Sequence, residues 1–402
     1  MKPHNEKHQI TLFLVSQNLS LFGSQVVSYA IIWYITLTTS SGLWLTLATV
    51  CSMLPQAAIS LWGGVFADRY SRKHLIMLAD GFIAAATLGL AVAFSLGFNR
   101  ISLLLAVSVI RSVGAGIQTP AVNALYPQLV PKEHLTRVQG INQTLGSALL
   151  LIAPAVGGII LGTAGIVWAF LIDVATALAA ILIMVFLKAD PISSGDVSSS
   201  ILGELRQGIS YTIQQPALRR IIICYACSYF LFTPAATLAP LLIERTFGHE
   251  VWHLAINQIV WSAGSLMGGI VISIHGDFHN KTKAIATGLV CFGITLFLQG
   301  ISPVFGLYLL FIGIAGFILP FIITLQTVYI QETVHNSMLG RVFSFVQIIS
   351  VSAMPVAILL FGPLADLMAV QVILLLTGAL LVFVGIAYDY SCRRAGADHL
   401  SD

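Results

Sequence analysis

Long apolar runs separated by short polar segments dominate this 402-residue sequence. A helix that crosses about 30 Å of hydrocarbon needs about 20 apolar residues, and twelve runs approach or exceed that length. Lipid offers no hydrogen-bond partners for backbone N–H and C=O groups, so each run is expected to be helical. The predicted fold is an all-α membrane protein with twelve transmembrane helices. The expected spans are 10–36, 43–66, 75–97, 102–123, 140–162, 166–187, 219–242, 253–275, 284–301, 304–328, 342–364 and 368–388.

Charged residues make up 9% of the chain and hydrophobic residues 57%. Soluble domains carry about 25% charged residues, so a soluble protein of this composition could not cover its surface with polar groups. Lipid must be its main solvent. The net charge of +3 gives no reason to expect a nucleic-acid partner. The first apolar run is longer than the core of a cleavable signal peptide, about 7–15 residues, and is predicted to remain as the first span.

Lysine and arginine are concentrated in alternate connecting segments. The termini and the loops after even-numbered spans hold nearly all of them, whereas Arg100 and Arg245 lie on the other side and Arg111 lies inside a span. Cytoplasmic segments of membrane proteins are enriched in these residues. We therefore predict a multi-pass protein of the cell (cytoplasmic) membrane with both termini in the cytoplasm.

The longest polar stretch divides the spans into two sets of six. We predict an N-terminal six-helix bundle over 1–188, a cytoplasmic linker over 189–217 and a C-terminal six-helix bundle over 218–402. The halves resemble one another faintly: Pro120 and Pro320 take equivalent places in the fourth and tenth spans. Parallel repeats of this kind are typical of transporters that hold their substrate between the halves.

Motifs in three places resemble the major facilitator superfamily. The loop between the second and third spans contains Gly64, Asp68, Arg69, Arg72 and Lys73, in the order of the superfamily's signature loop. In the family this loop closes against the other half, so the resemblance implies a conformational latch. The alternative is a basic loop that only sets the topology.

The second motif, in the fourth span, begins at Arg111 and resembles the superfamily's arginine motif. The third, Pro154, Gly157 and Gly158 in the fifth span, resembles the signature of antiporters, although Ala153 replaces its first glycine. This third motif implies export. Proline lacks the N–H that closes a helical bond and glycine allows close helix approach, so a bend that seals one face is expected there. Ordinary helix packing is the alternative.

A narrower resemblance, to the macrolide-efflux branch, covers nearly the whole chain. It is carried by residues 110–124, 129–133, 172–174, 339–344 and 353–355. It implies a monomer in the lipid bilayer that exchanges protons for hydrophobic or amphiphilic drugs such as macrolides. Export of a siderophore or another endogenous metabolite, and proton-coupled import of a nutrient, are the alternatives.

Arg111 is a charged residue near the middle of the fourth span. A charge there costs at least about 2.5–3.5 kcal/mol on insertion scales, which makes it a functional candidate. Asp173 lies at a similar depth in the sixth span, so the two can pair. They form either a proton-responsive couple or a permanent structural ion pair. Asp80, near the cytoplasmic end of the third span, is expected to pair with a loop arginine rather than to carry protons.

A substrate cavity is expected among the first, fourth, seventh and tenth spans, as the family resemblance implies. The first span carries a polar stripe at helical spacing, which includes Gln17 and Gln25. Aromatic side chains share a face of the seventh span, and amides occur in the fourth and tenth. The further candidates are Asn123, Tyr225, Tyr229, Phe232 and Gln326. Aromatic groups with few charges suit a large amphiphile.

One motif favours a different class of protein. His249, Glu250 and His253 match H-E-x-x-H, in which two histidines on one helix bind zinc and the glutamate acts as base. The segment is a short loop entering the eighth span, however, and the next histidines lie across the membrane. A membrane zinc metalloprotease is therefore kept only as an alternative. We expect no enzyme activity, no metal site and no cofactor, and the absence of a Walker A pattern argues against ATP as the direct energy source.

Overall fold

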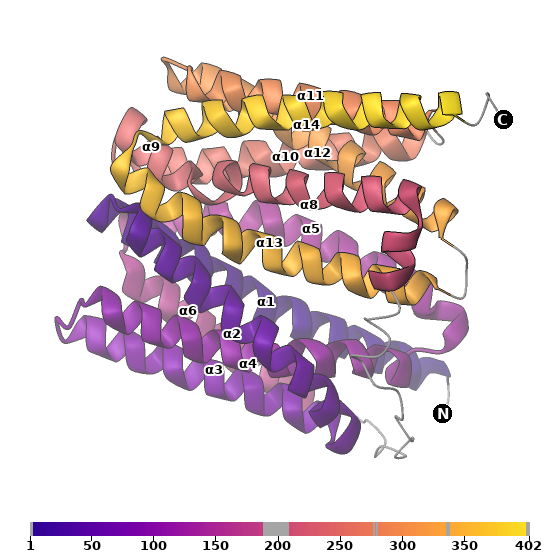
Figure 1. The fold of residues 1–402 in the computed structure, drawn as a ribbon. Helices are drawn as coiled ribbons and strands as arrows, with labels where there is room; N and C mark the ends of the chain where they lie inside the picture. Colours follow the sequence, from indigo (N-terminus) through magenta and orange to yellow (C-terminus); the bar gives the residue numbers. More distant parts are fainter. Residues whose placement is uncertain (1–2, 188–208, 276–277, 279, 335–337, 399–402) are drawn as a thin grey trace. The chain divides into compact units, whose positions relative to one another are not determined.

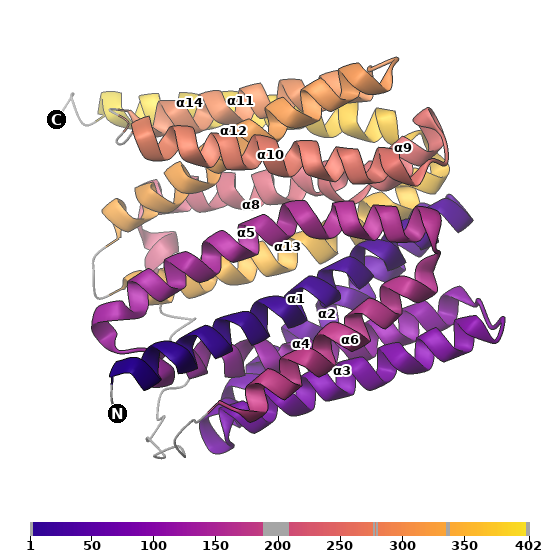
Figure 2. The ribbon, with the colours of Figure 1, turned by 180° about the vertical axis from the view of Figure 1, so that it is seen from behind.

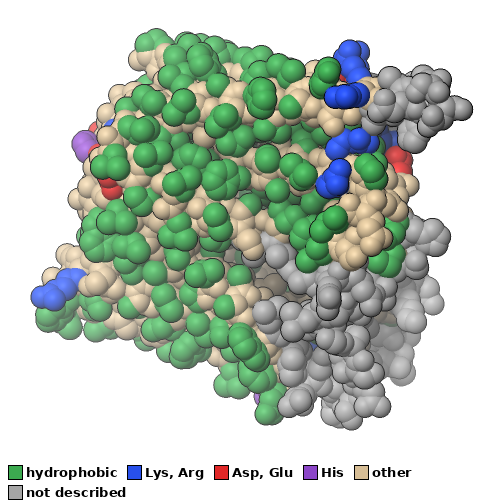
Figure 3. Space-filling view, viewed as in Figure 1, with side chains coloured by type: hydrophobic (Ala, Val, Ile, Leu, Met, Phe, Trp, Pro, Cys, Tyr) green, Lys and Arg blue, Asp and Glu red, His purple; other side chains and the backbone are tan. Residues whose placement is uncertain are grey.

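The computed structural model describes residues 3–187, 209–275, 278, 280–334 and 338–398. Over these residues eleven helices are long and apolar enough to cross a membrane, and a shorter apolar stretch, Ser352–Leu367, belongs to the eleventh predicted span. Hydrophobic side chains cover most of the surface drawn in Figure 3, while basic side chains lie toward the helix ends. This distribution fits an all-α membrane protein, as the sequence predicts.

The chain divides into two compact units. Unit 1 comprises 1–40, 44–196 and 249–256, and unit 2 comprises 41–43, 197–248 and 257–402. The predicted linker falls largely on residues outside the described ranges, although 209–214 is helical. The division into bundles over 1–188 and 218–402 stays a prediction.

The helices of the first half are long because their apolar runs are uninterrupted by polar segments. Pro55 and Pro154 lie inside two of them without ending the helix. The bounds are α1 Pro3–Thr39, α2 Gly42–Arg69, α3 Arg72–Ser95, α4 Ile101–Leu129, α5 Lys132–Thr163 and α6 Ile166–Val185.

Helix α1 packs against α4, α5 and α6, and α3 packs against α4 and α6 (Figures 1 and 2). Small residues allow the close approaches. A Cβ atom at Gly23 of α1 would overlap the hydroxyl of Thr176 and lie 2.9 Å from the Cα of Asp173 in α6. Glycine at position 23 therefore brings the backbones of α1 and α6 together beside a buried acidic side chain.

The second half contains a comparable set of helices. Their bounds are α8 Pro216–Thr237, α9 Ala239–Phe247, α10 Val251–His275, α11 Lys281–Gly300, α12 Phe305–Thr333, α13 Leu339–Leu367 and α14 Val370–Asp398. In unit 2, α11 packs against α12 and α14, and α8 packs against α12, α13 and α14. Figures 1 and 2 both show α11 beside α14.

These packing pairs repeat those of the first half. The pairs of α3 with α4 and α6 correspond to those of α11 with α12 and α14, and the pairs of α1 correspond to those of α8. Glycines recur as well: a Cβ at Gly116 would meet the α2 backbone carbonyl of Gln56, and one at Gly316 would meet the α10 backbone carbonyl of Trp261. The repeat suggested by the prolines is therefore also a repeat of helix packing.

The seventh predicted span differs from the expectation of one continuous helix. It is divided at Leu238 into α8 and α9. Pro240 stands in the first turn of α9, where its missing N–H needs no partner. Inside a continuous helix the same proline would leave the carbonyl of Ala236 without its usual bond, so the chain restarts the helix instead.

Candidate functional site

A polar cavity lies inside unit 1, among α1, α2, α4 and the side chains of α3 and α5 that reach it. Its volume is about 490 Å³, within the range of about 300–1,000 Å³ usual for small-molecule sites. Polar groups line much of its wall. The polar lining residues are Gln17, Asn18, Ser20, Ser24, Gln25, Ser28, Ser52, Gln56, Ser108, Arg111, Ser112, Gln118, Thr119, Tyr126 and Asn142.

The predicted stripe on α1 lines this cavity, with Gln17 and Gln25 among its members. The contribution of α2 was missed. A contribution of α4 was expected, but from Asn123 rather than from the residues that line the cavity, although a signal for these was present. On α4, Ser108, Ser112 and Thr119 recur at intervals of four and seven residues, the spacing of one helical face. Asn123 of the same helix is exposed and does not line this cavity.

Several buried polar atoms of the cavity wall have no hydrogen-bond partner among the described residues. They include the Nε2 of Gln17, the Oδ1 of Asn18 and the Oε1 of Gln25. Buried polar groups are normally paired, because an unmade bond costs about 1–3 kcal/mol. These atoms therefore offer one donor and two acceptors to a molecule that enters the cavity.

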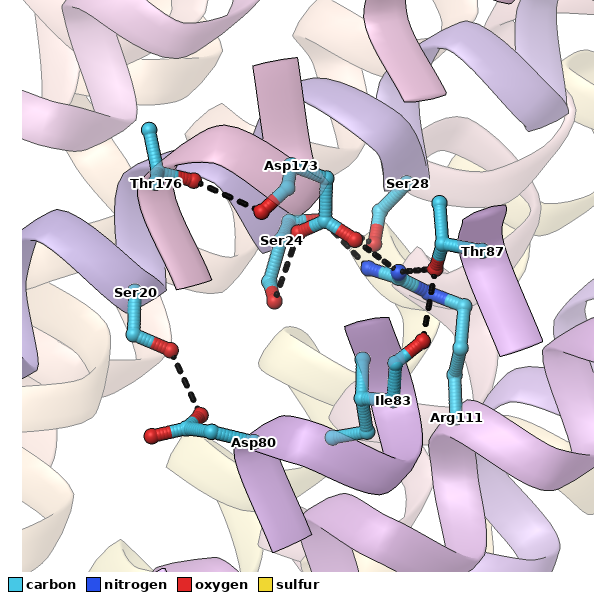
Figure 4. Close-up of polar contacts among 9 residues, drawn as sticks. All are labelled: Ser20, Ser24, Ser28, Asp80, Ile83, Thr87, Arg111, Asp173 and Thr176. Carbon is cyan, nitrogen blue, oxygen red and sulfur yellow. Dashed lines mark hydrogen bonds and ion pairs between the residues drawn. The ribbon is translucent and has the colours of Figure 1, made fainter. Parts of the chain in front are cut away.

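Arg111 and Asp173 form the ion pair that their matching depths predicted (Figure 4). The guanidinium of Arg111 also donates to Thr87 Oγ1 at 2.5 Å and to the carbonyl of Ser24 at 3.4 Å. The second carboxylate oxygen of Asp173 accepts from Ser24 Oγ at 3.3 Å. Both carboxylate oxygens thus have donors, and the exposed fractions of Arg111 and Asp173 are 9% and 1%.

Asp80 of α3 does not have the expected partner. Instead of a loop arginine, it faces two neutral donors: Ser20 Oγ and Gln118 Nε2, each 2.7 Å from Oδ1. The expectation was wrong because Asp80 lies about 12 Å along α3 from its first residue, inside the bundle. Arg72, at the start of α3, donates to the carbonyl of Ala124 at 2.8 Å.

The aromatic residues of α8 contact one another as their spacing predicted. The rings of Tyr225 and Tyr229 stack at 4.6 Å, and Tyr229 meets Phe232 edge-on at 5.2 Å. Tyr229, Phe232 and Gln326 line a cavity of only about 10 Å³ within unit 2. Gln326 is fully buried. This face is therefore largely filled by its own side chains, in contrast to the polar cavity of unit 1.

The predicted latch is only partly described. Gly64, Asp68 and Arg69 lie in or at the end of α2, but their side chains are outside the described part of the structure. Lys73 donates to the carbonyls of Val185 and Leu187 at 2.8 and 2.7 Å. A cation at the C-terminal end of a helix is favoured by the helix dipole, so Lys73 holds the end of α6 against the start of α3.

The antiporter-like motif lies within one continuous helix, α5. Pro154 is buried within α5. A Cβ at Gly157 would lie 3.5 Å from the carbonyl of Val26, and one at Gly158 would lie 2.8 Å from the Cβ of Ala255. At Gly158 a side chain would force its neighbour to move, so the glycine is needed for close packing.

The H-E-x-x-H motif does not adopt the geometry of a zinc site. His249 and Glu250 precede α10, which begins at Val251, and only His253 lies in the helix. Gly248, with φ of +104°, turns the chain before the motif. The two histidines are thus not on one helical face, as zinc binding by this motif requires.

The sequence is similar to known transport proteins over most of its length. A family model described as "Transmembrane secretion effector" matches residues 3–400. The chain is 30% identical over 391 residues to "Macrolide efflux protein A" of Streptococcus pyogenes, with 96% of each protein covered. It is 29% identical over 316 residues to the protein of the same name from Enterococcus faecalis (77% and 97% covered). It is 23% identical over 329 residues to "Enterobactin exporter EntS" of Citrobacter koseri (81% and 77% covered).

Solved structures share the fold at lower identity. A bacterial homologue of the human lysosomal transporter Spinster has a TM-score of 0.70 at 15% identity, with 98% of both chains covered. A bacterial homologue of the iron transporter ferroportin has a TM-score of 0.71 at 16% identity, with 94% of this chain and 98% of that chain covered. At these identities the likeness shows the fold alone.

Proposed function

The chain belongs to the transmembrane secretion effector family of the major facilitator superfamily, whose members are transporters and not enzymes. We propose that it exports hydrophobic or amphiphilic molecules of the macrolide type. Export proceeds across the cell membrane by alternating access, with both termini in the cytoplasm. Proton entry drives it: one charge moved through 100 mV is worth about 2.3 kcal/mol. The protein works as a monomer in the bilayer.

The polar cavity of unit 1 is the observation that carries this proposal. Its wall is rich in hydroxyls and amides, and Gln17, Asn18 and Gln25 leave polar atoms unpaired. A large molecule with an apolar body and several hydroxyl or carbonyl groups would satisfy them. Specificity in such sites comes from a few placed polar groups within an otherwise apolar pocket.

The same wall argues against the siderophore alternative. Arg111 is the basic residue among the described lining residues, and its guanidinium is already paired with Asp173. Siderophores of the carboxylate and catecholate types carry several negative charges, which would need unpaired cations. A neutral amphiphile needs none.

For the ion pair we propose the second of the two roles that the sequence left open. Arg111 and Asp173 hold α4 and α6 together permanently, and they are not themselves the groups that gain and lose the transported proton. The support is their saturation: each oxygen of Asp173 has a donor, and Arg111 has two further acceptors. Protonation of Asp173 would remove its charge and leave the buried charge of Arg111 unpaired.

The remaining candidates take supporting roles in the proposal. Residues 64–73 act as the latch between conformations. Pro154, Gly157 and Gly158 allow α5 to pack closely, which prevents leakage through the closed face. In another conformation, the rings of Tyr225, Tyr229 and Phe232 contact the apolar part of the substrate. The amides of Asn123 and Gln326 contact its polar groups.

The test is transport by the full-length protein in proteoliposomes with an imposed pH gradient. A labelled macrolide is expected to accumulate on the acidic side, and a protonophore is expected to abolish the accumulation. Accumulation of a labelled siderophore instead would favour the alternative exporter. Uptake that follows the macrolide gradient and ignores the protonophore would overturn proton coupling.

A matched pair of variants tests the cavity. Gln25→Leu keeps the side chain's size but removes the unpaired acceptor, and it is expected to raise the KM for the macrolide. Thr163→Val is the control, because this exposed residue bonds only to its own helix, at the carbonyl of Ile159. Equal kinetics in both variants would remove the unit 1 cavity from substrate binding.

A further inference from the structure

Asp80 and Asp173 are two buried acids of the same unit with different surroundings (Figure 4). The exposed fraction of Asp80 is 2% and that of Asp173 is 1%. Asp173 is paired with Arg111. Asp80 accepts two hydrogen bonds from neutral groups, both at Oδ1, and its Oδ2 has no partner among the described residues.

Among the residues that the structure describes, the helices packed around Asp80 bring no cation to it. The side chain of α1 that reaches it is Ser20, and that of α4 is Gln118. Arg111 of α4 directs its guanidinium to Asp173 and Thr87 (Figure 4). The acidic residue of α6 in the same unit, Asp173, directs its carboxylate to Arg111 and Ser24. The basic residues of α3 itself, Arg72 and Lys73, bond to backbone carbonyls.

An ionised carboxylate in this place would be a buried charge without a counter-charge, which is strongly unfavourable. A protonated carboxyl group is neutral, and it retains an oxygen that accepts from Ser20 and Gln118. The proton attaches to Oδ2, the oxygen to which no described residue donates. Asp80 therefore has the chemistry of a group that holds a proton.

Asp80 also has a connection to the cavity. It does not line the cavity itself, but both of its donors do: Ser20 and Gln118 stand between it and the open space. Ser20, which bonds Asp80, and Ser24, which bonds Asp173, lie four residues or about 6 Å apart along α1. The two acids are thus at different depths in one bundle, and only one of them lacks a cation.

We propose that Asp80 is a proton-binding site, filled and emptied from the polar cavity past Ser20 and Gln118 during the transport cycle. The O–H bond forms at Oδ2 when hydronium in the cavity gives up its proton. It breaks when the proton passes to water on the side of lower proton concentration. This inference rests on the proposed function for its role in export, but proton binding itself does not depend on transport.

The direct test is infrared difference spectroscopy on the purified full-length protein in sodium-free buffer, stepped between alkaline and acidic pH. The C=O stretching band of a protonated carboxylic acid is expected in the wild type, shifted in Asp80→Glu and absent in Asp80→Asn. Asp173→Asn is the matched control and is expected to retain the band. A band that survives in a folded Asp80→Asn, or that disappears in a folded Asp173→Asn while Asp80 is intact, overturns the proposal.

A transport arm separates this inference from the proposed function. In proteoliposomes, Asp80→Asn is expected to keep exchange of labelled for unlabelled macrolide, which needs no net proton movement. Its accumulation driven by a pH gradient is expected to fall to that of protein-free vesicles. Asp80→Glu is expected to restore part of it. If the wild type shows no macrolide transport but the infrared band behaves as expected, the proton site stands and the proposed substrate fails. Retained gradient-driven accumulation in Asp80→Asn overturns the site alone.

Discussion

Replacing one partner of the buried ion pair should destabilise the protein far more than replacing both. Asp173→Asn keeps the side chain's shape but leaves the charge of Arg111 without compensation, at a residue that is only 9% exposed. Removal of one partner of a buried pair costs about 3–5 kcal/mol. Arg111→Met is expected to destabilise the protein as well, because it leaves the charge of the Asp173 carboxylate uncompensated, with Ser24 as its remaining side-chain donor.

The double variant Arg111→Met with Asp173→Leu removes both charges and fills their space with apolar atoms. Replacement of a buried pair by apolar residues of similar volume is often neutral or stabilising, by about 1–4 kcal/mol. In this variant the hydroxyl of Thr87 loses its contact with Arg111 but still donates to the carbonyl of Ile83. The double variant is therefore expected to be more stable than either single variant.

The assay is reversible unfolding in mixed micelles with rising SDS, followed by the fluorescence of the six tryptophans. Asp389→Asn is the control, since Asp389 forms a partly exposed pair with Arg393 four residues away. Its loss is expected to cost about 0.3–0.5 kcal/mol. The reasoning is refuted if Asp173→Asn is no more damaging than this control, or if the double variant is less stable than both single variants.

Three further predictions concern packing, helix ends and metal. Gly23→Ala should lower the free energy of unfolding by about 1–3 kcal/mol, because its new methyl group meets Thr176 and Asp173. Gly89→Ala is the control, because its methyl group meets nothing within 4 Å, and it should leave that free energy unchanged. Unfolding in SDS compares the two variants. Lys73→Met should lower stability by about 0.3–1 kcal/mol and speed hydrogen exchange at the end of α6, and equal exchange in both proteins would contradict the cap. Purified protein equilibrated with zinc should hold well under one ion per chain by elemental analysis, since His249 precedes the helix that carries His253; a stoichiometric ion would contradict this reading.

The sequence was sufficient where lipid solvation alone decides the outcome. Apolar runs long enough to cross a bilayer must be helical, so the spans and the all-α fold follow from the pattern. The pairing of Arg111 with Asp173 also followed, because two opposite charges at one depth in hydrocarbon have few other partners. The recurrence of polar residues on α1 marked one wall of the cavity, and the same spacing on α4 could have marked another.

Only the tertiary structure decided which helices face one another, and this determined the partners of the remaining polar groups. Asp80 looked like a boundary residue by its distance from the basic loop. The packing of α3 against α4, together with the approach of Ser20 from α1, instead gives it two neutral donors. The aromatic face of α8 is evident in the sequence, but how much space remains beside it depends on side chains from other helices. The position of each span depends on the transfer of an apolar segment from water to lipid, which is a local property of the sequence. The environment of each buried polar group depends instead on contacts between residues far apart in the chain.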